Sequence, residues 1–251
     1  MQVQVHLTVS ESKRLIAKGI AEYHPVIEAQ RDGWVAIAKG STNAYVYEEL
    51  TGEKIDKSKY MTGHVVPATQ KGKTGFANEI PDLVLNKGQK VEGVSATDAL
   101  KEMGPGDVFM KGANALNYEE HLAGLLIGHP TGGTIGAAIG TVTARRIHFV
   151  IPVGLEKQVP YNIVDASYLV GPSEEERGKN FPAMWPLYGD VFTEIEAFRE
   201  LFDVEAYPIA AGGLAGAEGA TWFVLHGDKR SVADALKLVE EIRGEPPFVS
   251  Q

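Results

Sequence analysis

Residues 34–50 read WVAIAKGSTNAYVYEEL, and this stretch decides the fold. Its first part is a short apolar run that is typical of a buried strand. The second part predicts a helix, which Ser41 or Thr42 caps and Gly52 ends. A strand followed at once by a helix is the repeating unit of a parallel α/β sheet.

The same alternation continues along the chain. VFMKGAN (108–114) predicts a second strand, GGTIGAAIGTVTARR (132–146) a helix that starts with glycines, and IHFVIPVG (147–154) a third strand. We therefore predict an α/β protein with a Rossmann-like, mostly parallel sheet, helices on both of its faces, and a small C-terminal α+β domain.

The C-terminal third has a different composition. Residues 171–190 are polar and rich in Pro and Gly, which indicates a connector or lid loop. A helix, two strands and a last helix are predicted beyond it. We therefore expect a Rossmann-like anion-binding domain at 1–168, a connector at 169–190, and a small α+β domain at 191–251.

One segment has the length of a membrane span. No Asp, Glu, Lys or Arg lies between Glu120 and Arg145. The segment contains Pro130, several threonines and several glycines, and therefore lacks the hydropathy of a spanning helix. We expect a loop or short helix, a turn at HPTGG (129–133), and then a tightly packed helix.

Composition excludes several classes of function. The chain has 251 residues, 24 Lys plus Arg against 33 Asp plus Glu, and a formal charge of -9. A negative net charge argues against nucleic-acid and anionic-membrane partners. Cys is absent and the seven histidines show no ligand spacing, so we expect neither a metal site nor a cofactor. Residues 1–13 have no signal-peptide pattern, which makes the cytoplasm the expected location.

The first candidate site is formed by Lys39, Gly40, Ser41, Thr42 and Asn43. A glycine at a strand end followed by hydroxyl residues at a helix start leaves backbone N–H groups that bind anions such as phosphate. An ordinary helix cap is the alternative interpretation.

Two further turns have the same character. Gly112, Ala113 and Asn114 follow the second strand, and Gly132, Gly133 and Thr134 open the glycine-started helix. Glycines allow a ligand to approach the backbone closely. The alternative is that these glycines serve only the turn and the packing of the helix.

The candidate catalytic residues are Lys111, Glu156 and Lys157. Lys111 follows the second strand, where it can neutralise an anion, and helix N-termini on either side should depress its pKa. Glu156 and Lys157 are an adjacent acid and base just after the third strand, which suits proton transfer. A solvated surface ion pair is the alternative for these two residues.

Taken together, these motifs resemble the superfamily of ribose-5-phosphate isomerase, glucosamine-6-phosphate deaminase, CoA-transferases and translation-initiation-factor-2B-like isomerases. The resemblance covers roughly residues 10–160. It implies that Gly40, Ser41 and Thr42 bind phosphate and that residues 112–114 form the second turn of the site. Lys111 and Asn114 stand where ribose-5-phosphate isomerase has acidic residues, and 132–146 contains no acid.

These observations predict a metal-independent enzyme that binds a small phosphorylated or carboxylated metabolite, as a sugar-phosphate isomerase or lyase does. Two alternatives remain open. One is a non-catalytic sensor of a sugar phosphate or nucleotide, and the other is a CoA-transferase-like acyl carrier enzyme. In each case the partner is a small anionic molecule, and the protein is expected to be a homo-oligomer.

Overall fold

A computed structural model describes residues 1–71, 74–170 and 182–248 of the chain. Its largest sheet has six strands, four of them parallel. Their order is β10 (Asp190–Phe192), β8 (His148–Pro152), β5 (Val108–Met110), β2 (Trp34–Ile37), β3 (Leu83–Asn86) and β4 (Gln89–Lys90), the last two being antiparallel to their neighbours.

Two smaller sheets are antiparallel throughout. One consists of β1 (Gln2–Leu7), β12 (Thr221–His226) and β11 (Glu205–Ala211), and the other of β6 (Ala115–Asn117), β7 (Leu122–Ile127) and β9 (Ala183–Leu187). The protein is therefore a mixed α/β protein with a mostly parallel six-stranded sheet, as predicted, together with two small antiparallel sheets.

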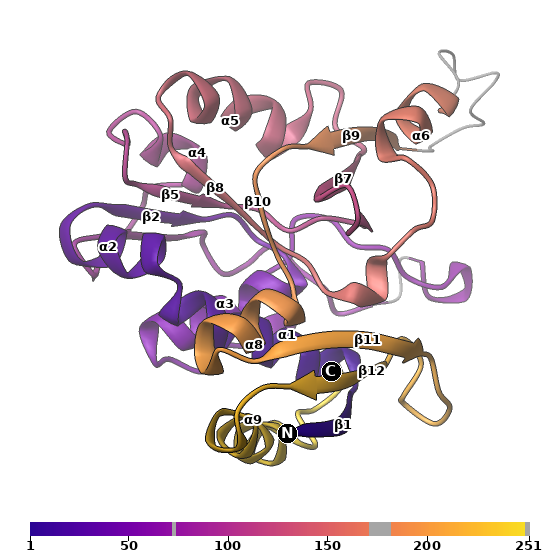
Figure 1. The fold of residues 1–251 in the computed structure, drawn as a ribbon. Helices are drawn as coiled ribbons and strands as arrows, with labels where there is room; N and C mark the ends of the chain where they lie inside the picture. Colours follow the sequence, from indigo (N-terminus) through magenta and orange to yellow (C-terminus); the bar gives the residue numbers. More distant parts are fainter. Residues whose placement is uncertain (72–73, 171–181, 249–251) are drawn as a thin grey trace.

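Helices cover both faces of the six-stranded sheet (Figure 1). One face carries α1 (Val9–Glu22), α2 (His24–Asp32), α3 (Ser41–Thr51) and α8 (Glu194–Phe202), and the other carries α4 (Ala96–Ala99) and α5 (Gly133–Ala144). The remaining helices are α6 (Ile163–Leu169), α9 (Lys229–Ile242) and the short 3-10 helices η1 (Lys57–Lys59), η2 (Ala68–Gln70) and η3 (Leu155–Lys157). Helix α1 lies between the large sheet and the sheet of β1, β12 and β11.

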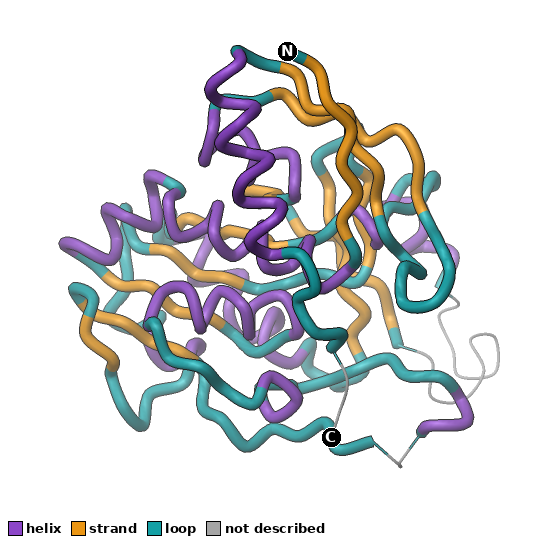
Figure 2. The backbone as a smooth tube through the Cα atoms, turned by 90° about the horizontal axis from the view of Figure 1, so that it is seen from below, coloured by secondary structure: helices purple, strands orange, loops and turns teal. Residues whose placement is uncertain are grey.

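Both ends of the chain contribute to the sheet of β1, β12 and β11. Strand β1 pairs with β12 over its whole length, and Figure 2 shows this sheet beside the N-terminus with helices packed against it. Strand β10 in turn pairs with β8 in the large sheet. Hydrogen bonds therefore cross between the two segments predicted as domains, 1–168 and 191–251.

Part of the predicted connector at 169–190 lies outside the described residues, namely 171–181. Within the described part, Ala183–Leu187 forms strand β9, which pairs with β7 along five residues. A tryptophan and a leucine in this short run supply apolar side chains to the strand.

The expectation of a loop or short helix just after Glu120 is wrong. Leu122–Ile127 forms strand β7, because antiparallel partners lie on both of its sides. The predicted turn and the helix α5 follow as expected. Nowhere in the described part of the chain does a helix have the length and apolar content needed to cross a membrane.

Helix α1 begins at Val9, with Thr8 as its N-cap. The Thr8 hydroxyl accepts a hydrogen bond from the Glu11 amide, and the Glu11 carboxylate accepts one from the Thr8 amide at 2.8 Å. This reciprocal capping box satisfies two helix-end donors. As a result Ser10, with its neighbours as far as Arg14, lies inside the helix and is buried.

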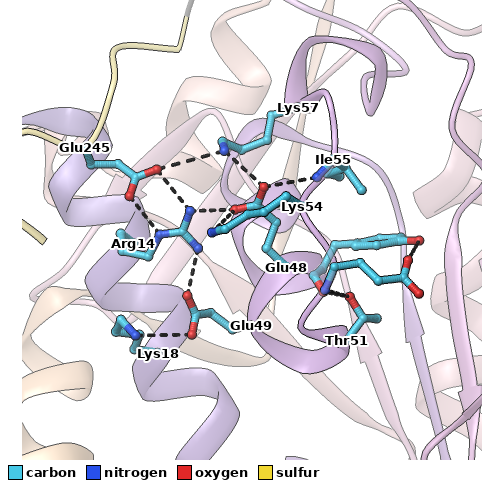
Figure 3. A network of polar contacts seen from close by, with 11 residues as sticks. Arg14, Lys18, Glu48, Glu49, Thr51, Lys54, Ile55, Lys57 and Glu245 are labelled. Atoms are coloured by element: carbon cyan, nitrogen blue, oxygen red, sulfur yellow. Dashed lines mark hydrogen bonds and ion pairs between the residues drawn. The ribbon is translucent and has the colours of Figure 1, made fainter.

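The guanidinium of Arg14 connects α1 to α3 and to the C-terminal segment (Figure 3). It donates hydrogen bonds to Glu48 at 2.6 Å, to Glu49 at 2.7 Å and to Glu245 at 3.0 Å. Burial alone raises the pKa of Glu48, but the hydrogen bonds from Arg14 and from the Ile55 amide hold it at about 2. The network is thus ionised and paired at neutral pH.

Replacing Arg14 by Met should lower the free energy of unfolding by about 3–5 kcal/mol, because Glu48 then remains buried without its strongest partner. Arg31→Met is the matched control, since Arg31 pairs with Glu28 and Asp32 on the exposed surface and should leave stability nearly unchanged. Urea denaturation measures both. Equal losses for the two variants would contradict the role assigned to Arg14.

Candidate functional site

The carboxyl ends of β2, β5 and β8 lie side by side and bring three loops to one edge of the large sheet. The Ala38 amide donates to Met110 at 3.0 Å and the Lys111 amide to Val150 at 3.3 Å, so the loops leave the sheet in register. A crevice of about 1920 Å³ opens there. Ligands of open α/β sheets bind at this edge.

Nearly all of the sequence-predicted site residues line this one crevice. They are Lys39, Gly40, Ser41, Thr42, Asn43, Lys111, Gly112, Ala113, Asn114, Gly132, Gly133, Thr134 and Lys157. Among the predicted residues only Glu156 is absent from the lining, although the next residue of η3, Lys157, is part of it. The structure thus gathers three predicted turns and two predicted catalytic lysines at a single site.

The start of α3 differs from the prediction in a way that matters for the site. Its N-cap is Gly40, and neither Ser41 nor Thr42 caps the helix. Thr42 is 2% exposed and Asn43 is 0% exposed, yet the Thr42 hydroxyl and the Asn43 carbonyl oxygen have no hydrogen-bond partner among the described residues. Buried polar atoms without partners cost free energy, so these two side chains are suited to a ligand.

The start of α5 requires glycine for a different reason. Gly132 has a φ of 83°, and a Cβ atom there would lie 2.8 Å from the Cα of Gly136. No other residue fits this turn without strain. The backbone of Gly132 therefore forms part of the crevice wall, and Thr134 is a polar residue of the same wall.

Besides Lys39, whose ammonium donates to the Asn78 side chain, three lysines from different elements line the crevice: Lys13 of α1, Lys111 after β5 and Lys157 of η3. Among the described residues, no carboxylate oxygen lies within 4.0 Å of any of their ammonium nitrogens. Lys157 donates to the carbonyl of Ala113 at 2.7 Å, and Lys111 has a long contact of 3.4 Å with the carbonyl of Lys39. These three ammonium groups are therefore not neutralised by direct ion pairs, although Glu11, Glu218 and Glu245 also line the crevice.

The pKa of each of these lysines lies below its ordinary value. Burial, followed by the charge of Lys157, lowers the pKa of Lys111 to about 8. Burial likewise lowers the pKa of Lys13 to about 8 and also lowers that of Lys157. The direction predicted for Lys111 is right, but its causes are burial and a second lysine rather than helix N-termini.

Glu156 is not the solvated ion-pair partner that was one of the alternatives. Both of its carboxylate oxygens are buried and have no hydrogen-bond partner in the described chain. Its close neighbour is Glu194 at the start of α8, which is 0% exposed and accepts hydrogen bonds from the Leu155 amide at 3.0 and 3.3 Å. Burial and the charge of Glu156 raise the pKa of Glu194 to about 7.

Burial and the charge of Glu156 thus favour the protonated form of Glu194 near neutral pH. The charges of Glu156 and Glu194 in turn favour the ammonium form of Lys157, and that of Glu156 favours the ammonium form of Lys13. Lys157 lines the crevice and the two acids do not, so the lysine is the member of this set that can exchange a proton with a ligand.

Part of the crevice wall is aromatic. Phe76 and Phe248 stack with ring centroids 5.8 Å apart, and the ring of His64 lies 5.3 Å from Phe76. The ammonium of Lys13 lies 5.3 Å from the centre of the Phe248 ring. This wall offers a planar apolar surface next to a positive charge.

Sequence reasoning missed Lys13, Glu194 and the aromatic wall. In the sequence Lys13 is one more polar residue of an amphipathic helix, and Glu194 is one more acid in the first turn of a helix. Only the packing of α1 on α8 shows that they belong to the site. The described residues contain no group of three or more His, Asp or Glu side chains arranged to hold a metal ion.

Comparisons with protein-family models, with curated proteins and with solved structures give no match for this chain.

Glu194 should make the folded protein less stable as pH rises from about 5 to 7. Its pKa is about 7 in the folded chain against an ordinary 4.5, so over this range the unfolded chain loses a proton that the folded chain keeps. Lys13 and Lys111 have pKa values of about 8 in the folded chain, so they affect the pH dependence of stability only at higher pH. In Glu194→Gln this decrease of the melting temperature with pH should be largely absent.

Glu200→Gln is the matched control, because Glu200 is exposed on the same helix. It should melt with the same pH dependence as the native protein. A Glu194→Gln variant that retains the full native slope between pH 5 and 7 would contradict the raised pKa of Glu194.

Proposed function

We propose that the crevice binds a small phosphorylated or carboxylated metabolite and catalyses proton transfer on it, as an isomerase or lyase. The observation that carries this proposal is the set of three lysines without carboxylate partners in the described chain, lining the same crevice as the start of α3. Because like charges repel and burial disfavours them, the lysines are stabilised when an anion binds. The Rossmann-like position of the crevice, at the carboxyl ends of parallel strands, supports the same reading.

The groups at the start of α3 suit a ligand with both an anionic group and a hydroxyl group. The Thr42 hydroxyl and the first amides of α3 donate hydrogen bonds, as phosphate and carboxylate require. The Asn43 carbonyl oxygen can only accept, and its amide nitrogen is already bonded to the carbonyl of Ala38 at 2.7 Å. A ligand hydroxyl is the natural donor to that oxygen, as in a sugar phosphate or a hydroxy acid.

The acid–base groups lie beside the anion site rather than in it. The charge of Lys157 lowers the pKa of Lys111, and the charges of Glu156 and Glu194 favour the ammonium form of Lys157. We assign the removal and return of a substrate proton to Lys157, which lines the crevice. Glu156 and Glu194 do not line it and act as positioning residues, whose charges favour the ammonium form of Lys157.

A second candidate function is a sensor that binds a nucleotide without turnover. The stacked rings of Phe76 and Phe248 favour it, because a base can stack on them while its phosphates reach the lysines. The volume of about 1920 Å³ also exceeds what a sugar phosphate fills. The two functions differ in whether bound ligand exchanges carbon-bound protons.

One experiment separates them. Thermal-shift measurements with inorganic phosphate, sugar phosphates, hydroxy acids, nucleotides and CoA esters identify stabilising ligands, and each is then incubated with the protein in D2O. An isomerase or lyase incorporates deuterium at a ligand carbon, as NMR detects. Stabilisation by nucleotides without deuterium incorporation would favour the sensor, and no stabilisation by any anion would contradict both functions.

Thr42→Val should weaken binding of the stabilising anion by about 10- to 100-fold, the value of a hydrogen bond to a charged group. In the absence of ligand the variant should be as stable as the native protein or slightly more stable, because a buried hydroxyl without a partner in the described chain is removed at nearly constant volume. Calorimetric titration and thermal melting measure the two effects.

Thr51→Val is the matched control at the other end of α3. The Thr51 hydroxyl donates to the carbonyl of Tyr47 at 2.7 Å, so this variant loses a satisfied hydrogen bond and should keep its affinity for the anion. Unchanged affinity in Thr42→Val would remove the start of α3 from the proposed site.

A further inference from the structure

Of the three lysines in the crevice, Lys111 has the least engaged amine. The Nζ atom of Lys157 is 2.7 Å from the Ala113 carbonyl, and that of Lys13 faces the ring of Phe248. Lys111 has only its 3.4 Å contact with the Lys39 carbonyl, which is at the limit of a hydrogen bond. Its side chain lines the crevice directly after β5, between the loops that follow β2 and β8.

The surroundings of Lys111 keep a large share of this amine unprotonated near pH 8. Its side chain is partly covered, Lys157 adds a second positive charge, and the nearest acid that affects it, Asp82, is bonded to the Ala96 amide and lies beyond ion-pair distance. At pH 7.5, an amine with a pKa of about 8 has more than about 100 times the unprotonated fraction of an ordinary lysine. A lysine next to another cationic group is a known kind of amine nucleophile.

We propose that the substrate carries an aldehyde or ketone group besides its anionic group, and that Lys111 forms a Schiff base with that carbonyl. This inference rests on the proposed function and specifies its substrate class. The free amine of Lys111 attacks the carbonyl carbon, a C–N bond forms, and the carbonyl oxygen becomes a hydroxyl. The ammonium of Lys157 protonates that hydroxyl, water leaves with the C–O electron pair, and an iminium ion remains.

The iminium ion explains how an isomerase or lyase works in this crevice. Its positive nitrogen accepts electrons from a neighbouring C–H or C–C bond when that bond breaks. The amine of Lys157, which lines the crevice and has given up its proton in the dehydration step, then takes up or returns the substrate proton, so no external oxidant or reductant is required. Hydrolysis of the iminium ion reverses the first steps and regenerates the amine.

The test uses pyridoxal 5′-phosphate as a probe, because it combines an aldehyde with a phosphate group. The native protein is incubated with the probe at pH 7.5 and treated with borohydride, which reduces the iminium carbon and fixes the adduct. Peptide mass mapping should find Lys111 labelled at least about 10-fold more than exposed lysines such as Lys237. Excess inorganic phosphate should suppress the label at Lys111 alone.

Lys111→Arg keeps the positive charge but has no amine that forms a Schiff base. It should lose the label while inorganic phosphate still raises its melting temperature, and Lys237→Arg should be labelled at Lys111 as the native protein is. Peptide mass mapping of the native protein tests the proposal even if one of the variants fails to fold.

The possible failures are distinguishable. Labelling confined to exposed lysines, or found at Lys13 or Lys157 instead, overturns the Schiff base at Lys111 while stabilisation by phosphate upholds the proposed function. Absence of both the label at Lys111 and any stabilisation by phosphate overturns the two together.

Discussion

The ion-pair network around Arg14 fixes the first helix against the third, and the functional crevice depends on that contact. Glu48, its closest partner at 2.6 Å, lies on the helix whose first residues carry Thr42 and Asn43. Glu245, a further partner, is three residues before Phe248 of the aromatic wall. A buried guanidinium with three carboxylates around it holds three segments, far apart in sequence, in one arrangement.

Two adjacent residues of the first helix differ in whether carboxylates pair with their charged side chains. Arg14 is surrounded by carboxylates, whereas Lys13, 7% exposed, has no carboxylate within ion-pair distance in the described chain. Burying a charge without a partner is costly, so such a group is expected where a ligand supplies the opposite charge. The contrast indicates that the network around Arg14 serves the fold, while the crevice lysines serve binding and chemistry.

Local sequence signals predicted the strand–turn–helix units, and with them the part of the crevice lining that follows β2 and β5 and begins α5. The bounds of α3 follow from the polar residues after β2 and from Gly52, which has a φ of 71°. Long-range packing was not predictable in this way. Strand β7 is recognisable only through its pairing with β9, about 60 residues later in the chain. Lys13 and Glu194 likewise join the site only because α1 packs on α8.

The most direct test of the central claim is an NMR titration of lysine side chains labelled with 13C, in the presence and absence of inorganic phosphate. Lys13 and Lys111 should titrate with pKa values of about 8, well below those of the exposed lysines. Phosphate should raise both values, because a bound anion favours the ammonium form. Titration of both lysines together with the exposed ones, unaffected by phosphate, would contradict the claim that the crevice holds unneutralised positive charge for an anionic ligand.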